Sequence, residues 1–425
     1  MWLEKCRANH PRYFYSVVFF VCFALIVARR ADVLAYPQFW AEDGTVWYEG
    51  AYYLGWGSLF VPHTGYFQTT SRLVALTAQL LPLAYAPLFF NVIAIVVKII
   101  PVLFIFFQRY RKNFFSILTP LVISLAYLSL PNTSEVHANI TNAHWFLAIT
   151  AFLILTAGKA TTRVGKYFDI CFLILAGLSG PFVIFLLPVA MIWWWRNRKD
   201  GYDWNQIVPV VSTVLIQVGA LLLTGASRVN MALGATPSLF VKITSGQLFL
   251  GTLLGKGGYT ALYNDILFAN GIKSQFFYAS IFLLGIFVLV WAAIKGPVRL
   301  RLFLLFTGLV YASALLKPMA SATQPQWAVM MLPGNAMRYW FLPMLGFLIS
   351  ILFLFAKKNP RPVKFLGFCV LLIMLYGMKY EWVYDSWPNL SFATYAHKFE
   401  QLAPGETIKI PIMPETWRKM KLIKR

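Results

Sequence analysis

The chain has 425 residues, of which 59% are hydrophobic and 17% aromatic, and its formal net charge is +22 at pH 7. A mean hydropathy of +0.65, with 37 Phe, 21 Tyr and 15 Trp, exceeds what the core of a water-soluble domain can bury. The composition therefore excludes a soluble globular protein and predicts an all-α, polytopic membrane protein. The positive charge lies in short loops and a basic tail, not on a soluble basic face, so we expect no nucleic-acid partner.

Apolar runs that could cross a bilayer recur along the chain. A helix needs roughly 20 apolar residues to cross the ~30 Å hydrocarbon core, and on this basis we predict about eleven spans. They lie near residues 13–31, 88–107, 114–131, 145–158, 167–179, 182–195, 206–224, 276–293, 302–316, 339–356 and 365–378. Residues 1–378 then form a transmembrane domain, and residues 379–425 form a short tail.

The orientation of the spans follows from the basic residues of the short loops. Segments such as QRYRKN and KKNPRPVK are rich in Lys and Arg, which is typical of cytoplasmic loops. This places the N-terminus inside, the tail outside, and four loops outside, at about residues 32–87, 131–145, 225–275 and 317–338. It also requires SRLVALTAQLLPLAYAP and LFVKITSGQLFLGTLLG to lie in the outer interface as amphipathic helices and not to cross the membrane.

An acidic pair, Glu42 and Asp43, stands in the first outer loop of a chain with only 15 acidic residues. Carboxylates beside a membrane are functional candidates, although a solvated loop pair is the alternative. Two close carboxylates separate their pKa values, so that one can act as a general base. We assign Asp43 as the base and Glu42 as its support, because Gly44 lets backbone and substrate approach closely; the order of the two acids stays open.

Cationic and aromatic residues near the same outer loops are candidates to bind a phosphate group, because the planar fork of Arg matches phosphate oxygens. These donor phosphate-binding candidates are Arg29, Arg30, Arg72, Arg338 and Tyr339. Arg29 and Arg30 could equally be interfacial anchors. Lys98, in the middle of a span, faces either the phosphate path or a polar interior contact.

Amide, imidazole, carboxylate and indole groups of the outer loops could bind sugar hydroxyls. These substrate-binding candidates are His63, Glu135, His137, Asn142, His144 and Trp145. Their spacing matches no zinc template, so we expect no metal and no firm cofactor, with a divalent metal as the alternative.

The outer face of a membrane offers no ATP or nucleotide sugar, so an activated donor would have to arrive on a lipid. The segments FWAEDG, NITNAHW and MRYWFLP, with the helix and loop order of residues 1 to about 200, resemble the GT-C superfamily of integral membrane glycosyltransferases. Within it, the chain is similar to bacterial transferases that use undecaprenyl phosphate (bactoprenol) sugars, such as the O-antigen glucosyltransferases of serotype conversion. It departs from many members in its tail, which is too short for an independent soluble domain.

The resemblance implies an inverting, direct-displacement transfer of a sugar such as glucose from a polyprenyl phosphate carrier to a surface glycan. The enzyme would act in lipopolysaccharide biosynthesis, in the bacterial inner membrane, with an extracytoplasmic active site. A flippase and a donor synthase would be its partners. Two other classes remain: a membrane acyltransferase that modifies a surface glycan, and a lipid-linked glycan transporter or flippase. An acyl donor would come from the cytoplasm, and a transporter would carry charges along several helices.

The predicted topology can be tested with reporter fusions. Reporters fused after Arg111, Lys166 and Lys358 should report a cytoplasmic location, because these residues lie in the basic loops. A reporter after Arg425 should report the opposite side. A cytoplasmic reporter at Arg425 would show that the span count is wrong by one, most simply near residues 239–255.

Overall fold

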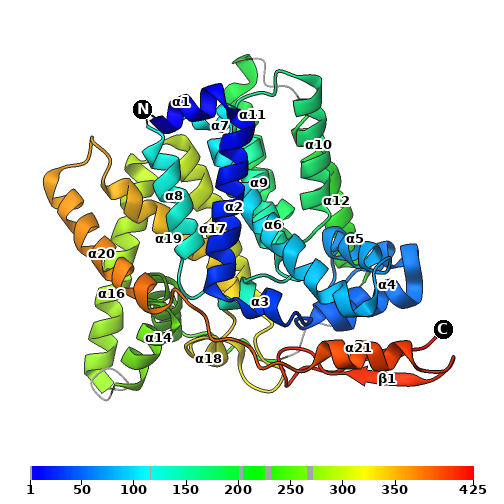
Figure 1. The fold of residues 1–425 in the computed structure, drawn as a ribbon. Coiled ribbons are helices and arrows are strands. Elements are labelled where there is room, and N and C mark those ends of the chain that lie inside the picture. The colour runs from blue at the N-terminus through cyan, green and yellow to red at the C-terminus, as the bar shows by residue number, and fades with distance from the viewer. Residues whose placement is uncertain (1, 115, 201–203, 225–230, 266–270) are drawn as a thin grey trace. The chain divides into compact units, whose positions relative to one another are not determined.

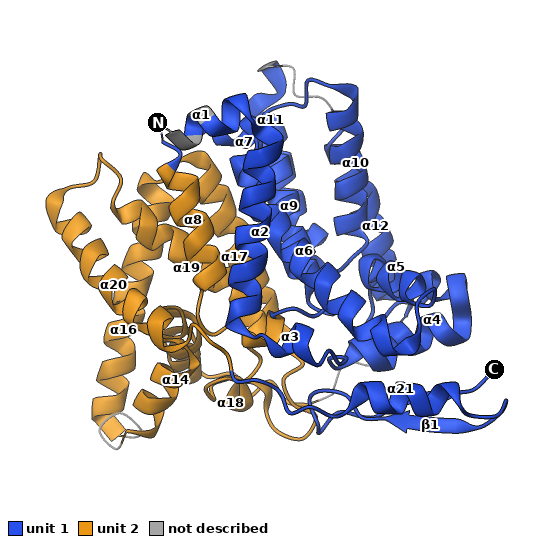
Figure 2. Ribbon diagram, in the orientation of Figure 1, with its two compact units in different colours: residues 1–117, 137–226, 385–425 blue, residues 118–136, 227–384 orange. Residues whose placement is uncertain are grey.

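Helices form most of the two compact units into which the chain divides (Figures 1 and 2). The computed structural model describes residues 2–114, 116–200, 204–224, 231–265 and 271–425. Unit 1 comprises residues 1–117, 137–226 and 385–425, and unit 2 comprises residues 118–136 and 227–384. Residues 385–425 of the predicted tail belong to unit 1 and residues 379–384 to unit 2, and the second predicted outer loop is likewise divided between the units.

Unit 1 contains six of the helices predicted as spans. They are α2 (Pro11–Arg29), α6 (Ala86–Phe106), α9 (Ala143–Thr156), α10 (Arg163–Gly177), α11 (Phe182–Asn197) and α12 (Ile207–Leu223). Short helices connect them: α1 (Trp2–Asn9), α3 (Asp32–Ala35), η1 (Asp43–Tyr48), α4 (Glu49–Leu54), η2 (Gly55–Phe60), α5 (Thr69–Ala78), η3 (Leu83–Tyr85), α7 (Gln108–Arg111) and η5 (Arg198–Asp200). Helix α9 packs against α6, α10 and α11 and is buried along almost its whole length, so it forms the centre of this unit.

Unit 2 is organised around α19 (Met337–Leu354), which is also buried along most of its length. Helices α8 (Leu118–Ser129), α16 (Gly271–Lys295), α17 (Val298–Leu316) and α20 (Arg361–Tyr380) pack against it. The remaining elements of the unit are η4 (Ser134–Val136), α13 (Pro237–Ile243), η6 (Thr244–Leu250), α14 (Gly251–Asn264) and α18 (Gln326–Met330).

Several helices have the length and composition of membrane spans. Within the described residues, seven are long and apolar enough to cross a bilayer: Pro11–Arg29, Leu83–Phe106, Pro237–Asn264, Gly271–Lys295, Val298–Leu316, Met337–Leu354 and Arg361–Tyr380. Large apolar side chains on their outer surfaces are exposed, for example Phe20 at 67% and Leu283 at 67%, which suits contact with lipid tails. The chain is thus a mostly helical, multi-pass membrane protein. Every predicted span contains a helix, although those from α8 to α12 are shorter than the roughly 20 residues that a straight span needs.

The segment from α13 to α14, for which the sequence predicts an interfacial position, forms a helical segment of 28 residues that is also long and apolar enough to cross a bilayer. It is bent at Gly255, whose φ of +72° is in the region that favours glycine. Gln247 lies before the bend and donates to the carbonyl of Leu332 at 2.7 Å, while Tyr259 lies after it and donates to that of Met331 at 2.9 Å. The bend therefore returns the second half of the segment to the loop that the first half contacts.

The tail has its own structure within unit 1. Helix α21 (Phe392–Glu400) is followed by two antiparallel strands, β1 (Thr407–Ile410) and β2 (Met420–Ile423), paired with Thr407 opposite Ile423. This hairpin was not anticipated by the all-α prediction. Phe392 packs edge-on against Phe39 of the first predicted outer loop, with ring centroids 5.3 Å apart, so the tail is anchored beside the acidic pair.

Candidate functional site

The acidic pair stands at the start of η1, a six-residue π-helix in unit 1. π-Helical turns are rare and occur frequently at functional sites. Gly44 lies in the first turn, where an added Cβ would come within 3.2 Å of Phe39 and 3.4 Å of Ile412. The glycine therefore allows η1 to pack closely against Phe39 of its own loop and Ile412 of the tail.

The Asp43 carboxylate is fully buried and joins the two predicted outer loops of unit 1. One oxygen accepts hydrogen bonds from the backbone N–H and the hydroxyl of Thr141, both at 2.7 Å. The other accepts from the backbone N–H of Ile140 at 3.1 Å. Three donors on a buried carboxylate fix the position of η1 against the second loop.

Different parts of the environment of Asp43 shift its pKa in opposite directions. Burial raises the pKa of the Asp43 carboxyl from 3.8 to about 7, the hydrogen bonds from Thr141 and Ile140 oppose this rise, and the charge of Glu42 adds to it. Burial has the larger effect because it removes the water that solvates the ionised form. The carboxyl therefore titrates near neutrality.

Glu42 differs from its neighbour in accessibility. It precedes the π-helix and is partly exposed, whereas Asp43 has no exposed surface. The two acids thus have separate roles available to them: Asp43 is built into the protein, and Glu42 can meet a molecule that arrives from outside.

The tail braces the backbone around the acidic pair. The Ala41 N–H donates to the Met413 carbonyl, and the Met413 N–H donates to the Phe39 carbonyl at 3.0 Å. Further along η1, the Trp417 indole donates to the Thr45 hydroxyl at 3.2 Å. The loop that carries the acids is therefore held on one side by the second loop and on another by the tail.

Arg72 supports the same π-helix from α5. Its guanidinium donates to the carbonyls of Val46 at 2.9 Å and Val61 at 3.2 Å and lies 4.8 Å from the centre of the Trp47 ring. Burial lowers the pKa of Arg72 to about 10, so the side chain keeps its charge at neutral pH. These contacts hold Arg72 against η1.

Two of the predicted sugar-binding residues of unit 1 are histidines that pack against aromatic rings. His63 lies edge-on to Trp47, and burial, with the charges of Arg72 and Arg418, lowers the pKa of His63 to about 4, so the imidazole is neutral. His144 stacks on Phe182 with ring centroids 5.3 Å apart.

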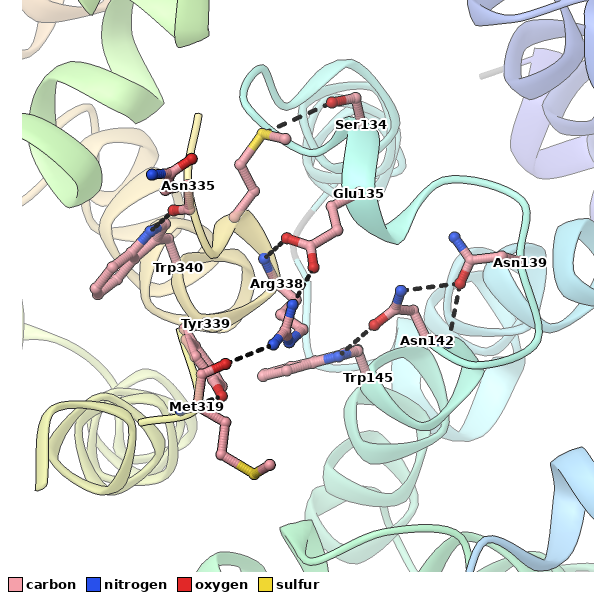
Figure 3. Close-up of polar contacts among 11 residues, drawn as sticks. Ser134, Glu135, Asn139, Asn142, Trp145, Met319, Asn335, Arg338, Tyr339 and Trp340 are labelled. Atoms are coloured by element: carbon pink, nitrogen blue, oxygen red, sulfur yellow. Dashed lines mark hydrogen bonds and ion pairs between the residues drawn. The ribbon is translucent and has the colours of Figure 1, made fainter. Parts of the chain in front are cut away.

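A series of side-chain hydrogen bonds lies in and next to the second predicted outer loop. The Trp145 indole donates to the Asn142 side chain at 3.2 Å, and the Asn142 amide donates to the Asn139 side-chain oxygen at 2.9 Å (Figure 3). The side chain of Asn139 in turn donates to the His137 carbonyl at 3.3 Å. These hydrogen bonds fix the backbone at His137.

Positive groups gather at the end of α2. The Arg30 guanidinium donates to the His137 carbonyl at 3.1 Å, and the Lys98 ammonium lies 3.4 Å from Nδ1 of His137. Arg29 and Arg30 are each 1% exposed, which disagrees with the alternative that they are anchors reaching the lipid headgroups.

The other three predicted site residues belong to unit 2 (Figure 3). The Arg338 guanidinium forms an ion pair with the Glu135 carboxylate, whose second oxygen accepts from the Arg338 backbone N–H at 3.0 Å. Arg338 also donates to the Met319 carbonyl at 3.2 Å, and the Tyr339 hydroxyl accepts from the Met319 N–H at 3.0 Å. These contacts tie the start of α19 to η4 and to the fourth predicted loop.

Several residues of these sites had no assigned role in the sequence. Thr141 lies in the segment NITNAHW but was assigned no role of its own, and Asp32 and Trp387 carried no local signal. Trp387 stacks on Trp40 with centroids 4.5 Å apart, although the two residues are far apart in the sequence. Among the described residues, no group of three or more His, Cys, Asp and Glu side chains is arranged to hold a metal ion.

Comparison of the chain with protein-family models, curated proteins and solved structures found no match.

The raised pKa of Asp43 predicts a pH-dependent stability. Between 3.8 and about 7 the folded carboxyl holds a proton that the unfolded chain has released, so the contribution to stability declines as the pH rises through this window and is level above it. We expect the melting temperature of the purified protein to fall between about pH 5 and about pH 7, and to fall less in Asp43→Asn. The control is Asp385→Asn, at an exposed position. An equal slope in wild type and Asp43→Asn would contradict this account.

The Arg338–Glu135 pair predicts coupled effects on stability. Arg338→Gln and Glu135→Gln should each lower the melting temperature by roughly 2–4 °C, and the double variant should add little, because each single change already breaks the pair. Additive losses would show that the two side chains act separately. A role of Arg338 in donor binding would appear as a loss of transfer that persists in the Glu135→Gln background and that Arg338→Lys restores only in part.

Proposed function

We propose that the protein is an integral membrane glycosyltransferase of the GT-C type, which moves a sugar from a polyprenyl phosphate carrier to a surface glycan at the extracytoplasmic face. The observation that carries the proposal is the way in which the fold holds the acidic pair. Asp43 is fully buried and held by three donors, and the adjacent Glu42 is partly exposed. A positioned carboxylate beside a membrane is what transfer from a lipid-linked sugar to a hydroxyl requires.

The accessibility of the two acids favours one order of roles. Glu42 is the general base, and Asp43 is the residue that positions it, which reverses the order expected from the sequence. The negative charge of Asp43, which titrates near neutrality, would raise the basicity of its neighbour further once ionised. Arg72 and the tail keep the conformation of the loop fixed when the substrate binds, because both contact the same π-helix.

The reaction proceeds by direct displacement. An acceptor hydroxyl attacks the anomeric carbon, and Glu42 takes the proton of that hydroxyl as the new glycosidic bond forms. The bond between the anomeric carbon and the phosphate oxygen breaks at the same time, and the polyprenyl phosphate leaves with the electron pair. Attack from the face opposite the leaving group inverts the anomeric centre.

The tail supports an extracytoplasmic site. Its backbone pairs with the loop that carries the acids, so both lie on the same side of the membrane, and α2 separates that side from the N-terminus. This supports an odd number of crossings, as in the proposed arrangement of about eleven spans. The return of α14 to the loop near Met331 supports an interfacial position for the segment from α13 to α14.

The class of reaction can be tested in cells. Mass spectrometry of the surface polysaccharide, with and without the gene, should show the loss of a hexose. Loss of an acetyl group would favour an acyltransferase instead, and an unchanged polysaccharide with accumulated lipid-linked glycan would favour a transporter.

The roles of the acids can be tested with purified protein and a synthetic polyprenyl phosphate sugar. Glu42→Gln should lose transfer by ~100- to 10,000-fold, as expected for a general base, while its melting temperature stays close to that of wild type. Asp43→Asn should lose both transfer and stability, because an amide cannot accept from all three donors.

The matched control is Glu415→Gln, which removes an exposed carboxylate of the tail and should be fully active. If Asp43→Asn retains its stability but loses more transfer than Glu42→Gln, the two roles are the other way round. If both variants turn over like wild type, the acidic pair is not the base and the proposed site is wrong.

A further inference from the structure

The short segment that leads into α5 carries two polar side chains, His63 and Gln68, whose hydrogen-bonding groups have no partner in the described part of the chain. A tight turn separates them: the His63 N–H donates to the Tyr66 carbonyl at 3.0 Å, and the Tyr66 N–H donates back to the His63 carbonyl at 3.3 Å. Gln68 follows this turn and was assigned no role from the sequence. We call residues 63–68 the polar turn.

Gln68 is buried, with 5% of its surface exposed, and it stands directly before the first residue of α5. A polar side chain at this position often accepts a hydrogen bond from the first turn of the helix, but Gln68 makes no such bond. Its side-chain oxygen is buried and has no hydrogen-bond partner among the described residues. Buried polar atoms are rarely left in this state, because an unsatisfied group destabilises the fold, so this oxygen is explained most directly by a donor that a ligand supplies.

His63 offers hydrogen-bonding groups without a charge. Its ring lies edge-on to Trp47, with centroids 5.1 Å apart, and its ring nitrogens make no hydrogen bond with the residues that the structure describes. Burial, with the charges of Arg72 and Arg418, lowers the pKa of His63 to about 4. The imidazole is therefore neutral at physiological pH and has one N–H donor and one acceptor nitrogen.

The backbone of the polar turn is fixed by side chains from two helices. From α12, the Gln217 amide donates to the Phe67 carbonyl at 3.2 Å, and the Gln217 side-chain oxygen accepts from the Phe67 N–H at 2.8 Å. From α5, Arg72 donates to the Val61 carbonyl at 3.2 Å, just before the turn. Polar groups on a fixed backbone need less ordering when a ligand binds, which favours binding.

The polar turn is also joined to the acidic pair. The Trp47 indole, on which the His63 ring packs, donates to the Thr141 hydroxyl at 2.9 Å, and this hydroxyl donates to the Asp43 carboxylate at 2.7 Å. Gln68 follows His63 by five residues on the same fixed segment. The two polar side chains therefore belong to the surroundings of the proposed site.

We propose that Gln68 is a substrate-binding residue whose side-chain oxygen accepts a hydrogen bond from a hydroxyl group of an uncharged sugar. This inference rests on the proposed function and names the chemical group that the site recognises. His63, on the same turn, offers a second contact to a hydroxyl. A hydroxyl can donate to the amide oxygen, whereas an ionised carboxylate or phosphate has no proton to donate, so Gln68 selects for uncharged sugars.

The substitution Gln68→Met separates ligand binding from stability. Methionine has a side chain of similar length and removes both hydrogen-bonding groups of the amide. The ligand-free variant should melt at or above the wild-type temperature, because no described protein group loses a hydrogen bond. The matched control is Gln217→Met, which leaves the Phe67 N–H and the Gly177 carbonyl without this partner and should melt at a lower temperature.

Binding is measured in nanodiscs with two probes, because the hydroxyl can belong to the donor or to the acceptor. The donor probe is a synthetic polyprenyl phosphate glucose, with polyprenyl phosphate as the reference that lacks the sugar. The acceptor probe is the unmodified surface polysaccharide, purified from cells without the gene. Gln68→Met should bind one of these two probes about 3- to 10-fold more weakly than wild type, as for the loss of one hydrogen bond. Its affinity for polyprenyl phosphate should be unchanged.

The second control is Gln401→Met, which removes an exposed glutamine of the tail and should bind both probes like wild type. Unchanged affinity of Gln68→Met for both probes would overturn the proposal, because a bound water would then account for the buried oxygen. A melting temperature as low as that of Gln217→Met would overturn it as well, because the amide would then be structural. Weaker binding of polyprenyl phosphate itself would overturn the assignment to a sugar.

If the donor probe responds, analogues that each lack one hydroxyl of the glucose ring test for direct contact. One analogue should bind wild type about as weakly as the complete sugar binds Gln68→Met, and the combination of that analogue with Gln68→Met should add little further loss. Independent, additive losses for every analogue would overturn a direct hydrogen bond between Gln68 and the sugar.

The binding result can be distinguished from the outcome for the proposed reaction. If Gln68→Met binds a sugar probe more weakly but wild type transfers no sugar, the role of Gln68 stands and the glycosyltransferase proposal fails. If wild type transfers sugar and Gln68→Met does so with the same KM for donor and acceptor, the function stands and the role of Gln68 is wrong.

Discussion

The buried carboxylate of Asp43 is the contact on which the candidate site of unit 1 depends. It accepts from Ile140 and Thr141 and so fixes the π-helix against the second loop. Without it, two backbone N–H groups and a hydroxyl would lose their acceptor, at about 1–3 kcal/mol for each buried group left unsatisfied. The direction of Glu42, and the position of Thr45 that receives the tail, follow from the same contact.

Unit 1 compensates buried charge in two different ways. Asp43 is a negative group surrounded by neutral donors, and its pKa of about 7 allows it to lose its charge near neutrality. Arg30 instead has fixed partners: the Asp32 carboxylate lies 3.7 Å from its Nε, and its guanidinium lies 3.6 Å from the centre of the Trp387 ring. In the first arrangement the charge of the buried group can change with pH, whereas in the second a group of opposite charge lies beside it.

From the sequence we could predict the features that depend on amino-acid composition, and also the residues that depart from that composition. Long apolar runs located the helices, because the bilayer sets their length, and Glu42 and Asp43 were conspicuous as acids in an acid-poor chain. It could not predict pairs that meet only after folding. Glu135 and Arg338 are 203 positions apart, and nothing in the periodicity of either segment indicates the other. The accessibility of the two acids was equally hidden, because neighbouring residues in a loop carry no pattern that distinguishes inside from outside.

The tail, which contacts the acidic loop, is synthesised long after that loop. Thr45 and Trp417 are 372 residues apart, so the loop is inserted long before the segment that braces it exists. During synthesis the ribosome must complete every membrane helix before Met413 can pair with Ala41 and Phe39. The described conformation of the loop is therefore reached only by a chain whose helices have all been delivered to the bilayer. Partly made chains carry the acids but not their support, which delays the assembly of the site until biogenesis is finished.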